Sequence, residues 1–179
     1  MKKKLLLGLL VLIGLVTITA CGKKGESSLK SESRYNTYTC KNTSESSGFK
    51  YLTSYTIELN SKNEPVKYSM KDGFGNYGDD VESFNNYCDG LKKSKENNKE
   101  KIEKYKNAGT MDVVCDDKNM DAYYVMTYNL DVIKDIEDYK NVNNEISKYT
   151  KADGTFDLDA WKNYFNTDSL KKGKYTCDF

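Results

Sequence analysis

Cysteine is the residue type whose chemistry is most constrained in this 179-residue chain, because five cysteines occur without a single histidine. The absence of histidine excludes Ser-His-Asp and Cys-His catalysis and imidazole ligation of a metal. Four cysteines, Cys40, Cys88, Cys115 and Cys177, are spread along the chain with no CxxC pair. In an exported protein, an even number of cysteines predicts disulfides. The alternative is a zinc site built from four scattered thiolates.

The fifth cysteine, Cys21, ends the short motif Ile18-Thr19-Ala20-Cys21. Three lysines and a sixteen-residue run, Leu5–Ala20, precede it, and that run is apolar apart from two threonines. A basic start, a short apolar core and small residues at the junction predict a secretory signal peptide. The run is short for a transmembrane helix, which needs about 20 residues. An ordinary secretion signal followed by a chance cysteine is the alternative to a lipid-attachment motif.

The motif resembles the lipobox of bacterial lipoproteins. That resemblance implies that the Cys21 thiol is joined to diacylglycerol and that the signal is then cut before Cys21. Two acyl chains are enough for stable attachment to a membrane, whereas one chain binds only marginally. The resemblance therefore implies a membrane partner, reached through diacylglycerol on Cys21.

The four remaining cysteines can pair in three ways. We favour Cys40–Cys177, because both residues end a Tyr-Thr-Cys segment and neighbouring strands can hold two cysteines at a Cα separation of about 5.5 Å. This leaves Cys88–Cys115, to which there is a geometric objection. A continuous helix from Cys88 to Asn107 would descend about 28 Å. The following strand would regain only about 13 Å before it reaches Cys115.

The second bridge therefore requires either a helix that stops or bends early, near Asn97-Asn98, or a strand that crosses steeply under the helix.

Hydrophobic periodicity supplies the elements that must position these cysteines. Alternating apolar residues predict strands within 34–41, 51–59, 66–70, 111–115, 124–130 and 174–179. Three- and four-residue steps predict one long amphipathic helix over 81–105, with Asp79 as its N-cap and Glu82 completing a capping box. Short helices are predicted within 132–139 and 158–165, the second capped by Asp157, and a last turn is capped by Thr167. The glycines of 72–78, "DGFGNYG", are expected to break the second strand.

This order of elements predicts an α+β fold. An antiparallel sheet made of hairpin runs carries the long helix across one face, and short helices follow near the C-terminus. The expected organisation is a signal peptide over 1–20, a lipid-anchored flexible tether over 21–33, and a single α+β domain over 34–179. The lipobox, the strand triplet, the lysine-rich helix, the second hairpin and the terminal "YTC" resemble the small YehR-like lipoproteins of Gram-positive bacteria. The segment 140–165 looks like an insertion relative to that family. The resemblance implies an anchored protein of the cell envelope and no particular activity.

The other candidate motifs do not match the residue patterns of known functional sites. The segment 149–160 fails as a calcium loop, because Tyr149, Lys151 and Ala160 stand where carboxylates are required. No phosphate-binding glycine loop is present. Four acidic residues around the second hairpin could perform acid/base chemistry in a cleft, but we favour a solvated turn as their explanation: Asp112, Asp116, Asp117 and Asp121.

Composition narrows the possible partners. Residues 1–20 contain three lysines and no acidic residue, so the remaining 25 basic and 27 acidic residues give a net charge of −2. This excludes a basic stripe for nucleic acid. Fifteen tyrosines exceed the needs of the core and could form a binding surface.

We therefore expect a lipid-anchored, non-catalytic binding module on the outer face of the bacterial cytoplasmic membrane. Its ligand is expected to be an envelope protein, a peptide or a glycan, and we expect no cofactor or metal. Two alternatives remain. One is a carboxylate-dependent envelope enzyme such as a glycan hydrolase. The other is a small substrate-binding lipoprotein, although one domain of this length leaves little room for two lobes.

Overall fold

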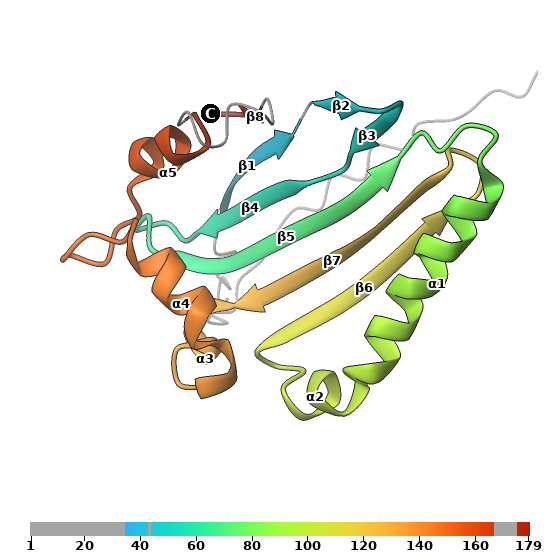
Figure 1. Cartoon of the computed structure of the whole chain (residues 1–179). Coiled ribbons are helices and arrows are strands. Elements are labelled where there is room, and N and C mark those ends of the chain that lie inside the picture. Colours follow the sequence, from blue (N-terminus) through green and yellow to red (C-terminus); the bar gives the residue numbers. More distant parts are fainter. Residues whose placement is uncertain (1–34, 43, 167–174) are drawn as a thin grey trace, which may run out of the picture. The chain divides into compact units, whose positions relative to one another are not determined.

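The computed structural model describes residues 35–42, 44–166 and 175–179. It is built on one antiparallel sheet (Figure 1). These residues all belong to one compact unit, Ser33–Phe179. The expected signal peptide, Cys21, the tether and the turn capped by Thr167 lie outside the described residues. The strands are β1 Asn36–Asn42, β2 Glu45–Ser46, β3 Phe49–Tyr51, β4 Ser54–Leu59, β5 Pro65–Gly75, β6 Gly109–Asp116, β7 Asp121–Asn129 and β8 Tyr175–Cys177.

The strand order follows from the pairings. Strands β6, β7, β5, β4, β1 and β8 lie side by side, and β3 and β2 extend the sheet beyond β4 along the end of β5. All pairings are antiparallel. The helices are α1 Val81–Asn97, α2 Lys99–Lys104, α3 Leu130–Ile133, the 3₁₀ helix η1 Glu137–Tyr139, α4 Lys140–Ser147 and α5 Leu158–Phe165. The chain is therefore α+β, with one long helix and several short ones, as the sequence predicts.

The register divides the sheet into two unlike faces. One cross-strand row joins Tyr55, Met70, Met126 and Met111 from β4, β5, β7 and β6. This face carries the helices, and we call it the inner face. The opposite, outer face is polar, because its cross-strand neighbours include Thr39 with Thr56 and Lys67 with Glu58. Alternation of apolar and polar residues along each strand produces this one-sided sheet.

The inner face is covered by two separate hydrophobic clusters. The large cluster joins β1, β4, β5 and β7 to α3, α4 and α5, and its buried members are Cys40, Ile57, Leu59, Tyr68, Tyr128, Leu130, Ile133, Ile146, Phe156, Trp161 and Phe165. The α1 cluster joins α1 to β7 near the start of that helix, and its buried members are Tyr77, Phe84, Cys88, Leu91 and Ala122. Both clusters and both disulfides lie within 35–179, so this part of the chain carries its own core.

The long helix begins at Val81 as predicted, but its N-cap and its C-terminal end differ from the prediction. Its N-cap is Asp80 rather than Asp79, because the Asp80 carboxylate accepts the Ser83 backbone N–H at 3.0 Å. It ends at Asn97, and α2 begins after Asn98. The helix therefore stops at the position that the pairing of Cys88 with Cys115 requires.

The glycine-rich segment is strand and not a break. Strand β5 continues through Gly75, and Gly73 pairs with Tyr123 of β7. A Cβ atom at Gly73 would collide with the backbone oxygen of Ala122 and with Tyr123. Glycine is thus required here by close approach of the neighbouring strand, and not by a turn.

Helix α4 was not expected from the sequence, whereas α5 and its cap were. Asp157 accepts the Ala160 N–H at 2.9 Å, as predicted for the N-cap of α5. In α4, Val142 packs against the large cluster and Ile146 is buried in it. Tyr139, Val142 and Ile146 are spaced at three and four residues, and this spacing was the available signal for the helix.

Candidate functional site

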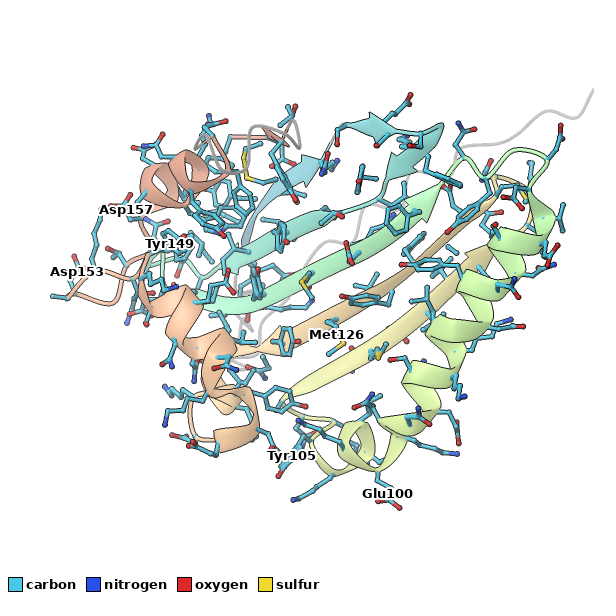
Figure 2. All side chains as sticks on the ribbon, viewed as in Figure 1. Glu100, Tyr105, Met126, Tyr149, Asp153 and Asp157 are labelled. Atoms are coloured by element: carbon cyan, nitrogen blue, oxygen red, sulfur yellow. A yellow bond between two sulfur atoms is a disulfide. The ribbon has the colours of Figure 1, made fainter. Side chains whose placement is uncertain are left out.

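A groove of about 410 Å³ opens on the inner face. Its floor is formed by three adjacent strands of the sheet, β5, β7 and β6, and includes Met70, Met126 and Met111. Figure 2 shows Met126 on this floor, with α1 on one side and α4 on the other. Methionine is flexible and polarizable, so a floor of three methionines can adapt to apolar groups of different shape.

Two helical walls flank this floor. Leu91 and Ser94 of α1 line one side together with Asn98 and two residues of α2, Lys101 and Ile102. The other side is lined by η1 and α4 through Asp138, Tyr139, Asn141 and Val142. Tyrosines complete the floor beside the methionines: Tyr124 and Tyr128. The groove is thus mostly apolar with polar groups at its edges, the composition that small-molecule sites share.

One end of the groove is closed by contacts between the two walls. The Lys101 ammonium lies 3.8 Å from the Asp138 carboxylate and 5.5 Å from the centre of the Tyr139 ring. The ring of Tyr105, which follows α2, meets the ring of Tyr139 edge to face at 5.7 Å between centroids. Both charged side chains of the ion pair are almost half exposed, so its contribution to stability is small. It nevertheless joins the two walls, since Lys101 lies on α2 and Asp138 on η1.

The tyrosines around the groove remain neutral at physiological pH. Burial, followed by the charge that a neighbouring Tyr139 would carry, raises the pKa of Tyr128 to about 12. Burial and then the Asp72 carboxylate raise the pKa of Tyr124. Neutral phenols present an apolar ring together with a hydroxyl that can donate a hydrogen bond. The floor therefore offers apolar surface with a few hydrogen-bonding groups and no charge of its own.

The four cysteines of the domain form two disulfides, which are the two pairs expected from the sequence. Cys40 of β1 and Cys177 of β8 lie directly opposite each other, with Cα atoms 4.0 Å apart. Cys88 of α1 and Cys115 of β6 are joined with Cα atoms 5.9 Å apart. One bridge therefore ties β8, at one edge of the sheet, to its neighbour, and the other ties α1 to the opposite edge strand. Disulfides of this kind persist in oxidising surroundings.

The acidic residues near the second hairpin do not converge on one site. Asp116 accepts the backbone N–H groups of Lys118 and Asn119 in the β6–β7 turn, and Asp112 faces Lys95 at 3.4 Å. In the rejected calcium loop, Asp153 accepts hydrogen bonds from Thr155 instead. Within the described ranges, no group of three or more acidic, cysteine or histidine side chains could hold a metal ion.

Sequence reasoning identified the tyrosine surplus and missed the methionines. Met70, Met111 and Met126 belong to three separate strands, and each appears in the sequence only as one apolar residue of an alternating run. Their convergence depends on strand register, which pairs Met70 with Met126 and Met126 with Met111. The expected lipid-attachment residue, Cys21, lies outside the described residues.

Comparison with protein-family models and with curated proteins finds no match. Among solved structures, the chain is similar to an NMR structure of a protein from Streptococcus pneumoniae TIGR4, with a TM-score of 0.39 and 13% sequence identity. The alignment covers 96% of this chain and 100% of that chain. No helix of the described part of the chain is long and apolar enough to cross a membrane.

Proposed function

We propose that this protein is a non-catalytic binding lipoprotein, anchored to the outer face of the cytoplasmic membrane through Cys21. The groove on the inner face is its ligand site and takes a small ligand with an apolar part. The apolar core and lipobox of the first 21 residues support the anchor. The two disulfides support the compartment, because such bonds persist in oxidising surroundings.

The groove is the observation that carries the binding role. Its volume of about 410 Å³ lies within the range of small-molecule sites, about 300–1,000 Å³. Met126, on its floor, is only partly buried although it lies on the helix-bearing face of the sheet. A partly uncovered apolar floor gains stability when a ligand covers it, at about 25 cal/mol per Å² of apolar surface removed from water.

The carboxylates of the groove lining favour binding over a carboxylate-dependent enzyme. Asp138 is the carboxylate of the described lining, and it faces the Lys101 ammonium. Acid/base hydrolysis of a glycan uses two carboxyl groups that flank the scissile bond. Of the four aspartates near the second hairpin, Asp116 serves in a turn and Asp112 in an ion pair instead.

A polar substitution on the floor tests the groove. Met126→Gln keeps the length of the side chain but removes apolar contact equivalent to about two methylenes, so an apolar ligand should bind about tenfold more weakly. The probe is N-phenylnaphthylamine, a neutral fluorophore, titrated into the oxidised chain 22–179. Val125→Gln is the matched control, because the neighbouring residue on β7 points to the outer face.

Saturable binding that weakens in Met126→Gln and not in Val125→Gln supports the assignment. Equal affinity in both variants would place the probe elsewhere and contradict it.

The anchor needs a separate test in the bacterial membrane. Cys21→Ala removes the thiol that would carry diacylglycerol, so the variant should lose labelling by radioactive fatty acid and should accumulate as uncleaved precursor. Cys21→Ser is a second variant with the same expected result, since a hydroxyl does not replace the thiol. If either variant still partitions into detergent at the mature size, the lipobox interpretation is wrong.

A further inference from the structure

A half-buried carboxylate lies on the inner face beside the floor of the groove. Asp72 is two residues from Met70 on β5, about 7 Å along the strand, and it pairs in register with Tyr124, a lining residue of the groove. The Thr53 hydroxyl donates a hydrogen bond to Asp72 Oδ1 at 2.7 Å. Thr53 is itself buried and holds the carboxylate in place.

Asp72 has no basic partner in the part of the chain that the structure describes. The seven ion pairs found there all join other residues. A half-buried carboxylate with one hydrogen bond retains acceptor capacity, since an ionised carboxylate has two oxygens and about four lone-pair positions. Its negative charge therefore remains available to a ligand.

The Asp72 charge helps to raise the pKa values of tyrosines on four elements. The pKa of Tyr87 on α1 is raised to about 12, first by burial and then by the Asp72 charge. Burial and Asp72 likewise raise the pKa of Tyr124 on β7. Burial is the largest cause of the raised pKa values of Tyr55 on β4 and Tyr175 on β8, and the Asp72 charge also raises both values. Neutral tyrosine rings near a carboxylate attract cations, since the face of each ring is electron-rich.

We propose that the ligand of the groove is a small amphiphilic cation, whose ammonium head pairs with Asp72 and whose apolar tail lies on the methionine floor. This inference rests on the proposed binding function and names the class of ligand. The contacts of Lys101 with Asp138 and Tyr139 join the two walls at one end of the groove and suit a tail that terminates there. Charge complementarity specifies the head, because Asp72 lies beside an uncharged floor, whereas the charged lining residues Lys101 and Asp138 pair with each other.

Three probes with the same octyl tail separate the contribution of the head group to affinity from that of the tail. They are tested on the unmodified chain 22–179. Octyltrimethylammonium, octanol and octanoate compete with N-phenylnaphthylamine at concentrations below their micellar ranges. The cation should bind about tenfold more tightly than the alcohol, and the anion should bind more weakly than the alcohol. This comparison requires no variant and therefore no assumption about the folding of one.

Two substitutions then test whether the preference for the cation depends on Asp72. Asp72→Asn retains an oxygen that accepts from Thr53 and removes the charge, so it should lower the affinity of the cation to that of octanol and leave octanol unchanged. Asp89→Asn is the matched control, because it removes one exposed carboxylate from the surface of α1.

The outcomes distinguish the two proposals. If octanol binds as tightly as the cation, the cation site is overturned and the groove is left as an apolar site. The same holds if the preference for the cation survives in Asp72→Asn. If none of the three probes displaces the fluorophore and Met126→Gln has no effect on it, the proposed binding function fails as well.

Discussion

The two clusters of the inner face bury apolar surface in different ways. The buried core of the large cluster runs from Cys40 to Phe165, so it depends on contacts between distant parts of the chain. The α1 cluster is local, and its core runs from Tyr77 to Ala122 with one long helix over β6 and β7. Five buried residues form its described core, against eleven in the large cluster.

This difference explains why the groove lies where it does. The disulfide between Cys88 and Cys115 ties α1 to β6, the strand at one edge of the sheet, so the helix covers that edge and not the centre. The large cluster covers the opposite part of the face, where Cys40 and Cys177 join β1 to β8. Between the two covers, Met70 and Met126 remain only partly buried. The groove is thus the strip of sheet between the two clusters that neither of them buries completely.

Removing the disulfides gives the largest expected effect and compares the clusters directly. In the chain-entropy model, loss of the 137-residue link between Cys40 and Cys177 lowers the free energy of unfolding by about 5 kcal/mol. Loss of the 27-residue link between Cys88 and Cys115 lowers it by about 3.5 kcal/mol. Denaturation by guanidinium of the two double Cys→Ala variants measures both values. A larger loss for the shorter link would contradict the comparison.

Amide hydrogen exchange of the variant without the Cys88–Cys115 bridge tests whether the two clusters unfold separately. Without the bridge to Cys115, α1 should exchange its amide protons through local opening, while the strands of the large cluster stay protected. Uniform loss of protection over both clusters would show that they unfold as one unit.

Two glycine substitutions should act in opposite directions. Gly73→Ala places a Cβ against the Ala122 backbone and Tyr123, and overpacking of this kind costs about 1–3 kcal/mol. Gly90→Ala, on α1, meets no atom within 4 Å, and alanine is favoured over glycine in a helix by about 0.5–1 kcal/mol. Thermal unfolding of both variants tests the pair. Destabilisation by Gly90→Ala would mean that this face of α1 is covered.

Acid should lower the free energy of unfolding by a smaller amount than these substitutions, and partly through groups on the α1 side. Hydrogen bonds from Ser83 lower the pKa of Asp80, and those from Asn119 lower the pKa of Asp116. On the other side, hydrogen bonds from Thr155 lower the pKa of Asp153. Since each folded pKa lies below the unfolded value near 3.8, this stabilisation is present above about pH 4 and is lost as the pH falls through the folded values.

Asp80→Asn isolates the effect at the start of α1. This variant keeps a capping oxygen but does not titrate, so its stability should depend less on pH between 5 and 2 than that of the unmodified chain. Unfolding followed by circular dichroism at each pH measures the slope. An unchanged slope would assign the acid sensitivity to other groups.

Local signals in the sequence account for most of the fold. Alternating residues identified the paired strands other than β2 and β3, and Asp157 identified the start of α5. The pairing of Cys88 with Cys115 even indicated the break at Asn98, because a continuous helix could not return to the disulfide. Gly73 was misinterpreted because glycine marks a turn and a close strand contact equally well, and only the register distinguishes them.

The groove could not be predicted, because its parts are brought together by long-range pairing. Met70, Met126 and Met111 form one row only after β5, β7 and β6 adopt a particular register, and a shift by one residue would move each to the opposite face. Asp72 lies inside the glycine-rich segment that was expected to break the second strand. Its position on the inner face follows from the extension of β5 through Gly75.

The methionine methyl groups offer the most direct test of the binding groove. In the chain 22–179 labelled with ¹³C at the methionine methyls, Met70, Met111, Met120 and Met126 each give one signal. Octyltrimethylammonium should shift the signals of Met70, Met111 and Met126, which line the groove, and show nuclear Overhauser contacts to them. Met120, which packs against the α1 cluster, should stay in place as the internal control. Shifts confined to Met120, or no saturable shift at any of the three groove methionines, would contradict a ligand site between the two clusters.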